Sequence, residues 1–304
     1  MVIRKNIFTK IILFATLFNF CFGGFFEDSE LEINTNSFIF NDDTILLEID
    51  NCNISSPKTS DREARANNEV YVVGHAYGKP GEGNFFPTNL TSFFDLNLTK
   101  NSKNYIALNG DFVRIANNQS FDKVKNYIDQ NFDGYFISVG NHEIANNLEY
   151  YYNFFDRDFF YQEFNNFLLI SANFSNNDWL PSEKQIAQIN QLIENTNKKN
   201  IILLSHQIFW IEETDNEIKP NSDDLLNTSL EADSLGWIKS AKNKNFIIIS
   251  GDYGAWGDTT YCKIKDNKLF IANGIGNSPN DSIIKIHDYE KSFLIEEINL
   301  AKEN

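Results

Sequence analysis

Five short apolar runs in this chain each end at a glycine or serine that is followed by a residue able to bind a metal ion or move a proton. These residues are His75, Asp111, the adjacent pair Asn141 and His142, His206 and Asp252. Strands of α/β sheets place ligand sites just beyond their carboxyl ends, so these ends are expected to meet at one site. Carboxylate, amide and imidazole groups together suit Mn, Fe, Zn or Mg. The pattern therefore predicts a divalent metal centre.

Each residue of this set also has an ordinary structural interpretation when it is taken alone. Asp111 fits a turn, His206 a hydrogen-bonded core histidine, and Asp252 a helix cap. The chemical interpretation depends on their common position, since three of the four histidines of the chain lie at these strand ends. The fourth, His287, lies next to Asp288 in a late strand, and we expect it at the surface or at a sheet edge.

The segments that position these residues indicate a mixed α/β fold without internal repeats. Helical periodicity predicts a helix over residues 120–130 behind a Ser120 cap, and another over 181–195 opened by a capping box from Ser182 to Gln185. Strands are predicted at residues 70–73, 105–108, 135–139, 201–204, 246–250, 261–265, 269–272, 282–286 and 292–295.

Over residues 70–286 the ordered motifs resemble those of the calcineurin-like metallophosphoesterases. That family carries D-x-H, G-D, G-N-H-D/E, a lone His after a strand, and G-H-x-H. Here Gly110-Asp111, Gly140-Asn141-His142-Glu143 and Ser205-His206 resemble the second to fourth motifs, and Gly251-Asp252 stands in the place of the fifth. The resemblance implies a two-sheet β-sandwich flanked by helices, an αββα architecture, that hydrolyses phosphate esters.

The chain departs from this family in its first and last motifs. His75 stands where the family has Asp, Tyr77 where it has His, and Asp252 and Gly254 where it has two histidines. The resemblance thus implies one well-formed metal site, and a second site that has lost its carboxylate and at least one imidazole. The ligands expected at the surviving site are Asp111, Asn141, His206 and Asp252. Because Asp252 makes this site more anionic, Mn, Fe or Mg is favoured over Zn.

The remaining residues of the site are expected to act on the substrate. His142, positioned by Glu143 or a backbone group, is expected to stabilise or protonate the leaving oxygen. His75 is expected to add positive charge, act as a base or bind a second ion weakly. Arg114 is placed to hold a phosphate oxygen, although an ion-paired or solvent-facing arginine fits equally. Tyr77 and Trp256 are candidate substrate contacts, and Tyr77 alternatively only lines the site.

Charge and the N-terminal residues bear on partners and location. The formal net charge of −16 and pI of about 4.7 disfavour nucleic acid as a partner, although a solvated acidic surface explains them equally. Residues 1–26 combine a basic start with a short apolar run, which predicts a signal peptide cleaved near Gly23 or, as the alternative, an uncleaved membrane anchor. The body is then periplasmic, extracellular or anchored, and the N-terminal segment contacts the membrane at least during export.

Two further segments complete the organisation. Residues 27–68 are predicted to form a β-hairpin, with strands at 37–40 and 44–49, and a linker; residues 69–304 form the phosphoesterase-like domain. A disulfide between Cys52 and Cys262 is chemically allowed in an exported protein, but their wide separation favours two separate buried thiols. The long segments 79–103, 145–180 and 208–230 are expected to surround the site, and their aromatic residues to fill a core, with substrate stacking as the alternative.

These observations favour an exported or membrane-tethered metal-dependent phosphoesterase that hydrolyses a phosphate mono- or diester with a metal-activated water. Its substrate is expected to be a phosphate-ester small molecule or an envelope glycan or lipid. The altered first and last motifs favour an alternative, a catalytically degenerate phosphoesterase-like module that binds a ligand or envelope polysaccharide. A third hypothesis is hydrolysis of a bond other than a phosphate ester, with His75 as base.

Overall fold

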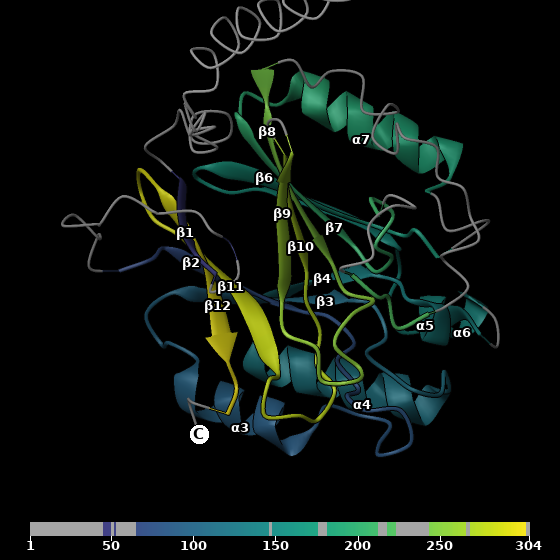
Figure 1. The fold of residues 1–304 in the computed structure, drawn as a ribbon. Helices are drawn as coiled ribbons and strands as arrows, with labels where there is room; N and C mark the ends of the chain where they lie inside the picture. Colours follow the sequence, from purple (N-terminus) through teal and green to yellow (C-terminus); the bar gives the residue numbers. More distant parts are fainter. Residues whose placement is uncertain are drawn as a thin grey trace, which may run out of the picture.

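The computed structural model describes residues 45–49, 52, 65–145, 148–175, 181–211, 218–222, 243–265 and 268–301. Two six-stranded sheets pack face to face, with helices on their outer sides (Figure 1). This is the two-sheet αββα sandwich that the motifs predicted. None of the helices in the described residues is both long and apolar enough to cross a membrane.

The first sheet has the strand order β1-β12-β11-β2-β3-β4. Its strands are β1 (Ile45–Glu48), β2 (Asn68–Val73), β3 (Lys103–Asn109), β4 (Gly134–Ser138), β11 (Ser282–Asp288) and β12 (Phe293–Asn299). Strands β2, β3 and β4 are parallel. The helices α3 (Thr88–Asn97) and α4 (Asn118–Asn131) connect them and cover the outer face of the sheet. The carboxyl ends of these three strands therefore lie at one edge of the sandwich.

The second sheet has the order β5-β6-β7-β8-β10-β9. Its strands are β5 (Phe159–Glu163), β6 (Phe167–Ala172), β7 (Asn200–Ser205), β8 (Asn245–Ser250), β9 (Tyr261–Lys265) and β10 (Lys268–Ala272). The four central strands are parallel, and β5 and β9 are antiparallel edges. Helix α7 (Glu183–Asn195) covers the outer face, and the short helices α5 (Asn141–Ile144) and α6 (Leu148–Tyr152) follow β4 (Figure 1).

The core lies between the sheets and continues beneath the helices. In β7, Ile202 and Leu204 belong to the cluster between the sheets, whereas Ile201 and Leu203 pack in the cluster that includes residues of α7. Successive side chains of a strand point to opposite faces, so a strand covered on both sides is apolar throughout. The aromatic residues of the long segments were expected to fill a core, and most of them do. The buried ones are Phe86, Phe93, Phe94, Tyr151, Phe155, Phe160, Phe164, Phe167, Phe174, Phe209 and Trp210.

Both predicted helices form, with corrections at their starts. Helix α4 begins after Asn117, whose side chain accepts a hydrogen bond from the Ser120 backbone N–H at 2.9 Å, so Ser120 lies inside the helix and is not the cap. Asparagine is as strong an N-cap residue as serine, which accounts for the error. Helix α7 is capped by Ser182 as predicted, but the Gln185 side chain accepts from the backbone N–H of Asn173. That contact ties the helix to the segment after β6.

The segment 145–180 was expected to surround the site, and this is wrong for its central part. It supplies β5 and β6, and β6 is buried along its whole length in the second sheet. Strand β1 falls within the second strand of the predicted hairpin but pairs in parallel with β12. The other hairpin strand, 37–40, and the predicted signal, 1–26, lie outside the described residues.

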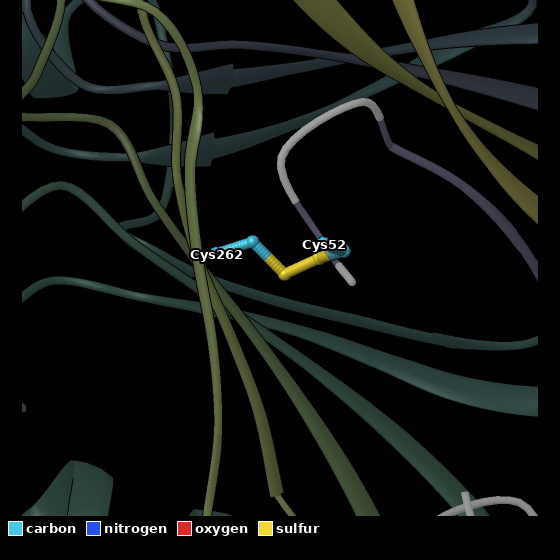
Figure 2. Close-up of a disulfide and its surroundings, with 2 residues drawn as sticks. All are labelled: Cys52 and Cys262. Carbon is cyan, nitrogen blue, oxygen red and sulfur yellow. A yellow bond between two sulfur atoms is a disulfide. The ribbon is translucent and has the colours of Figure 1, made fainter. Parts of the chain in front are cut away.

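Cys52 and Cys262 form a disulfide with a Cα–Cα distance of 5.4 Å, so the prediction of separate thiols is wrong (Figure 2). Cys52 follows β1 at an edge of the first sheet, and Cys262 lies in β9 at an edge of the second. Packing of the sheets brings these edges together across 210 residues of sequence.

His287 also differs from expectation. It lies in β11 between β12 and β2, and its imidazole Nε2 is 2.8 Å from Glu296 and its Nδ1 3.5 Å from Glu69. The ring is therefore an ion-paired, mostly buried group and is at neither the surface nor a sheet edge.

Candidate metal centre

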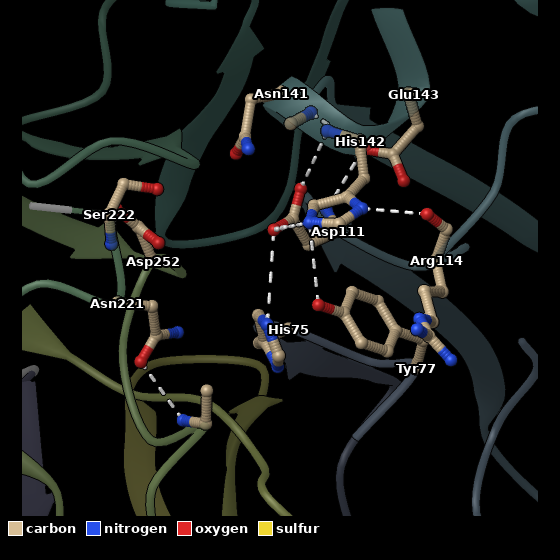
Figure 3. Close-up of polar contacts among 12 residues, drawn as sticks. His75, Tyr77, Asp111, Arg114, Asn141, His142, Glu143, Asn221, Ser222 and Asp252 are labelled. Carbon is tan, nitrogen blue, oxygen red and sulfur yellow. Dashed lines mark hydrogen bonds and ion pairs between the residues drawn. The ribbon is translucent and has the colours of Figure 1, made fainter. Parts of the chain in front are cut away.

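The structure brings together the side chains that follow the five predicted strand ends. His75 follows β2, Asp111 follows β3, Asn141 and His142 lie in α5 directly after β4, His206 follows β7, and Asp252 follows β8. Figure 3 shows the Asp111 carboxylate at the centre of these groups, with His142 and Tyr77 on one side and Asp252 on the other. The sandwich thus joins the carboxyl ends of parallel strands from both sheets at one site.

The backbone at these strand ends is unusual. His75 and Asp111 have φ angles of 48° and 51°, in the left-handed region that residues with a side chain seldom adopt. Such conformations concentrate at functional sites, where the surrounding structure maintains them. A Cβ atom on Gly140 would lie 2.3 Å from Oδ1 of Asp111, and one on Gly110 would lie 2.2 Å from the ring of His206. Glycine at these two positions lets the ligating side chains approach.

Hydrogen bonds to the side chain of Glu143 hold the turn that contains Asp111. The carboxylate of Glu143 accepts backbone N–H groups of Gly140, Asp111, Phe112 and Val113 at 2.7 to 3.1 Å. Burial, together with the Asp111 carboxylate, raises the pKa of Glu143 to about 7, although these donors favour its ionised form. Glu143 therefore positions Asp111 by binding the backbone on both sides of it.

Asp111, His206 and Asp252 are buried and offer ligand atoms that all lie within 4.8 Å of one another. The imidazole Nε2 of His206 lies 3.4 Å from Oδ1 of Asp111 and 3.8 Å from Oδ1 of Asp252. The same nitrogen is 3.1 Å from Oδ1 of Asn141. Of the four ligands predicted for the surviving metal site, three form this compact group, and the fourth contacts it through its amide oxygen.

The protonation of each residue in this group depends on the charges of the others. Burial lowers the pKa of the His206 imidazole, but Asp111 and Asp252 outweigh it and raise that pKa to about 10. Burial raises the pKa of Asp111, yet His206, His142 and His75 bring it well below its usual value. Burial, and then Asp111, raise the pKa of Asp252 to about 6. Without a metal ion, a proton on His206 is the positive charge that holds the two carboxylates together.

The group has the chemistry of a divalent cation site. The Nδ1 of His206 lies 3.1 Å from the carbonyl oxygen of Asn109, a contact that leaves Nε2 as the ligating nitrogen. Apart from the 3.8 Å contact with Nε2 of His206, the buried Oδ1 of Asp252 has no hydrogen-bond partner among the described residues, so it lacks the close compensation that a buried carboxylate oxygen requires. A cation beside His206 would supply it. Two carboxylates, an imidazole and an amide oxygen are donors that suit Mn, Fe, Mg and Zn.

The residues expected at the degenerate second metal position do not form a comparable set. Nε2 of His75 lies 3.9 Å from Oδ2 of Asp111, and its Nδ1 lies 3.1 Å from the carbonyl oxygen of Ile275. Burial lowers the pKa of His75 to about 4, so near pH 7 the ring is neutral and adds no positive charge. Tyr77 packs against the rings of His75 and His142, and Gly254 has no side chain to offer.

His142 is held at the open side of the centre by the backbone. The ring Nδ1 of His142 lies 2.7 Å from the carbonyl oxygen of Arg114, and the backbone N–H of His142 donates to Oδ1 of Asp111 at 3.1 Å. The side chain is 32% exposed, and its Nε2 lies 3.9 Å from Oδ2 of Asp111 and 3.4 Å from the hydroxyl of Tyr77. Of the two positioning partners considered for His142, the backbone group makes the contact, while Glu143 braces Asp111.

The two remaining predicted residues lie farther out. Arg114 is exposed, and its side chain runs from the carbonyl that holds His142 toward Tyr77 (Figure 3). Trp256 is 66% exposed and lies four residues after Asp252 in the chain. Both can meet a substrate only outside the buried group.

Sequence reasoning missed two residues that contact Asp252. The backbone N–H of Asn221 donates to the carbonyl oxygen of Asp252 at 3.0 Å, and the N–H of Ser222 donates to its Oδ2 at 3.4 Å. These residues lie in the predicted surrounding segment 208–230, but no motif marks them. Only a three-dimensional contact across about thirty residues identifies them.

No family model matches the chain, and no curated protein matches its sequence. Among solved structures, the phosphopantetheinyl hydrolase of Mycobacterium tuberculosis is similar over 69% of this chain and 90% of its own, with 12% identity and a TM-score of 0.41. Vacuolar protein sorting 29 from Entamoeba histolytica and from Cryptosporidium parvum is similar over 76% and 77% of this chain and 98% and 97% of theirs. Their identities are 10% and 9%, with TM-scores of 0.34. At these identities the similarities concern the fold alone.

Proposed function

We propose that the protein is a metal-dependent phosphoesterase whose centre is the Asp111–His206–Asp252 group. The observation that carries the proposal is the buried Oδ1 of Asp252, which receives no hydrogen bond from the described residues, beside a histidine whose Nδ1 is already engaged. Three buried groups, two of them carboxylates, lie close enough to share a cation, and the partly exposed His142 stands beside them with its Nε2 3.9 Å from Oδ2 of Asp111. A ligand set next to an accessible acid–base group is the arrangement that metal-assisted hydrolysis requires.

The residues around this group have separate tasks. A divalent ion bound here would supply a Lewis acid that neutralises phosphoryl oxygens and lowers the pKa of water. His142 presents Nε2 on the open side beside the Tyr77 hydroxyl, where it is placed to exchange a proton with the leaving oxygen. Arg114 offers a guanidinium at the exposed rim, where two of its N–H groups can hold phosphate oxygens. His75, neutral near pH 7, packs beside Asp111 with its Nε2 3.9 Å from Oδ2 of that carboxylate.

We further propose that the protein acts outside the cytoplasm, on a small phosphate ester or an envelope glycan or lipid. The Cys52–Cys262 disulfide supports this location, because disulfides persist in oxidising compartments and are rare in the cytosol. The basic and then apolar N-terminal residues support it independently. The high negative charge of the chain disfavours nucleic acid as a substrate.

One observation favours a second candidate, a binding module without turnover. The second metal position holds His75, Tyr77 and Gly254, so a second ion would find one imidazole there but no carboxylate of its own and no second imidazole. Two-metal phosphoesterases use both ions to stabilise the attacking and leaving oxygens. A centre with one ion can bind a phosphorylated ligand and leave it intact.

Hydrolysis of chromogenic phosphate mono- and diesters separates these candidates. The chain without residues 1–23 would be assayed with added Mn and with chelator, beside Asp111→Asn and the exposed control Asp258→Asn. The proposal predicts metal-dependent turnover that the control retains and Asp111→Asn loses. A folded, Mn-binding protein that turns over neither ester would contradict catalysis and favour the binding module.

A further inference from the structure

Two buried polar atoms that have no hydrogen-bond partner among the described residues lie on contacting segments at the edge of the metal centre. One is Oδ1 of Asp252, an acceptor, and the other is Nδ2 of Asn221, a donor. The segments are joined because the backbone N–H of Asn221 donates to the carbonyl oxygen of Asp252 at 3.0 Å. Leaving such a group unsatisfied costs free energy, so each requires an explanation.

The orientation of the Asn221 amide follows from its own contacts. Its Oδ1 accepts a hydrogen bond from the backbone N–H of Ala255 at 3.0 Å, which assigns the oxygen to that side and the NH₂ group to the other. Figure 3 shows the amide beside Asp252, with its nitrogen directed toward the side where His75 lies. The free donor therefore faces the centre and not the protein body.

The two atoms need ligands of opposite kinds. A cation held by Asp111, His206 and Asp252 would satisfy the carboxylate oxygen but not an N–H donor, which requires an acceptor. His75, on the same side, has its Nδ1 engaged with the carbonyl oxygen of Ile275 and its Nε2 3.9 Å from Oδ2 of Asp111. An oxygen atom that reaches the centre together with the substrate would be such an acceptor.

We propose that Nδ2 of Asn221 is a substrate-binding donor that holds a non-bridging oxygen of the substrate's phosphate group. This inference rests on the proposed function and assigns to Asn221 part of the oxyanion contact that a second cation would make. It also defines the preferred ligand class as tetrahedral oxyanions, which bring several acceptor oxygens to one centre. Ser222 serves a different purpose, since its N–H orients Asp252 at 3.4 Å.

The test measures binding of inorganic phosphate to the Mn-loaded protein by calorimetry, after the Mn affinity of each variant has been measured separately. Asn221→Asp keeps the oxygen that Ala255 binds and replaces the donor by an acceptor. Asn221→Leu removes the donor without adding charge. Gln130→Glu is the matched control, because it makes the same amide-to-carboxylate change at an exposed position in the last turn of α4, before β4 begins.

We expect Asn221→Leu to bind Mn within about threefold of the wild type, and both Asn221 variants to bind phosphate roughly 10- to 100-fold more weakly, as for loss of a hydrogen bond to a charged group. Gln130→Glu should bind both like the wild type. Phosphate affinity in Asn221→Leu that equals the wild-type value, with Mn still bound, would overturn the inference.

These measurements distinguish failure of this inference from failure of the proposed phosphoesterase function. A wild-type protein that binds Mn and hydrolyses a phosphate ester, while the Asn221 variants bind phosphate normally, leaves the function standing and removes only the role of Asn221. A wild-type protein that binds neither Mn nor phosphate removes both. Thermal unfolding of each variant, compared with Gln130→Glu, shows whether a loss of phosphate binding comes from a loss of fold.

Discussion

Substitution of Gly110 by alanine should displace His206 and weaken the metal centre. Gly110 has φ of 80°, and an added Cβ would lie 2.2 Å from Cγ and Nδ1 of the His206 ring. His206 is fully buried, so its ring cannot move aside into solvent. Gly81 offers a matched control, since its φ is 99° and an added Cβ would meet nothing within 4 Å. Both substitutions strain the backbone, but only Gly110→Ala places an atom against a metal-ligating side chain.

The expected magnitudes follow from these two contributions. A side chain in the left-handed region costs about 1–2 kcal/mol, and this cost applies to both variants. Overpacking a well-packed interior costs a further 1–3 kcal/mol, roughly, and this cost applies only to Gly110→Ala. We therefore expect Gly110→Ala to lower the free energy of unfolding by about 2–5 kcal/mol, against about 1–2 kcal/mol for Gly81→Ala.

Urea unfolding of the metal-free proteins and Mn titration of the folded ones measure the two effects. Gly110→Ala should bind Mn at least about tenfold more weakly, because one ligand bond lost or bent is worth more than about 1.4 kcal/mol. Gly81→Ala should bind Mn like the wild type. Equal unfolding free energies and equal Mn affinities in the two variants would refute the view that Gly110 makes room for a ligating His206.

Three further predictions concern the scaffold. Replacing Cys262 by serine removes the disulfide with Cys52, which joins positions 210 residues apart, and should lower the free energy of unfolding by about 2–5 kcal/mol. A melting temperature equal to the wild-type value both with and without reductant would contradict this prediction. Despite burial, His287 and Lys285 lower the pKa of Glu69 to about 2, so Glu69 adds stability above its unfolded pKa of 4.5 and loses it as pH falls toward 2. Glu69→Gln should therefore lower the free energy of unfolding by on the order of 3 kcal/mol at pH 7. In urea unfolding, this difference in free energy from the wild type should shrink below pH 4.5. A difference that does not change with pH would contradict this prediction. Ser182→Ala removes the α7 cap and should cost about 1 kcal/mol, and no change in urea midpoint would count against the cap.

The strand ends and their polar residues could be predicted because both signals are local. Each run of apolar residues is long enough for one buried strand, and the glycine or serine after it ends the run directly before the functional residue. The parallel order of β2, β3 and β4 then follows from the intervening helices, which return the chain to the same edge. This is why His75, Asp111 and His142 could be assigned to one site from their positions alone.

Contacts made between distant segments could not be predicted in the same way. The approach of Asn221 to Asp252, and of Cys52 to Cys262, depends on how the sheets and loops pack, and neither pair has a fixed sequence spacing. His287 is similar, because whether its strand lies at an edge is decided by β12, which pairs with it later in the chain. Periodicity indicates that an element forms, but it does not name the neighbours of that element.

Strands β5 and β6 show a second limit. Their segment is rich in Phe and Tyr, residues that suit a core, a strand or a substrate surface equally well. Without alternation of apolar and polar residues, β6 has no period that distinguishes a strand buried on both faces from other apolar segments. The placement of these residues was decided by the second sheet, which needs a neighbour for β7.

The most direct test of the account is the number of Mn ions bound per chain, measured by equilibrium dialysis with metal analysis. Asp252→Asn keeps the shape of the side chain and removes its charge, and Asp258→Asn makes the same change at an exposed position of the same loop. The account predicts one ion per chain in the wild type and in Asp258→Asn, and strongly weakened binding in Asp252→Asn. Two ions per chain, or unchanged binding in Asp252→Asn, would contradict a single centre built on Asp111, His206 and Asp252.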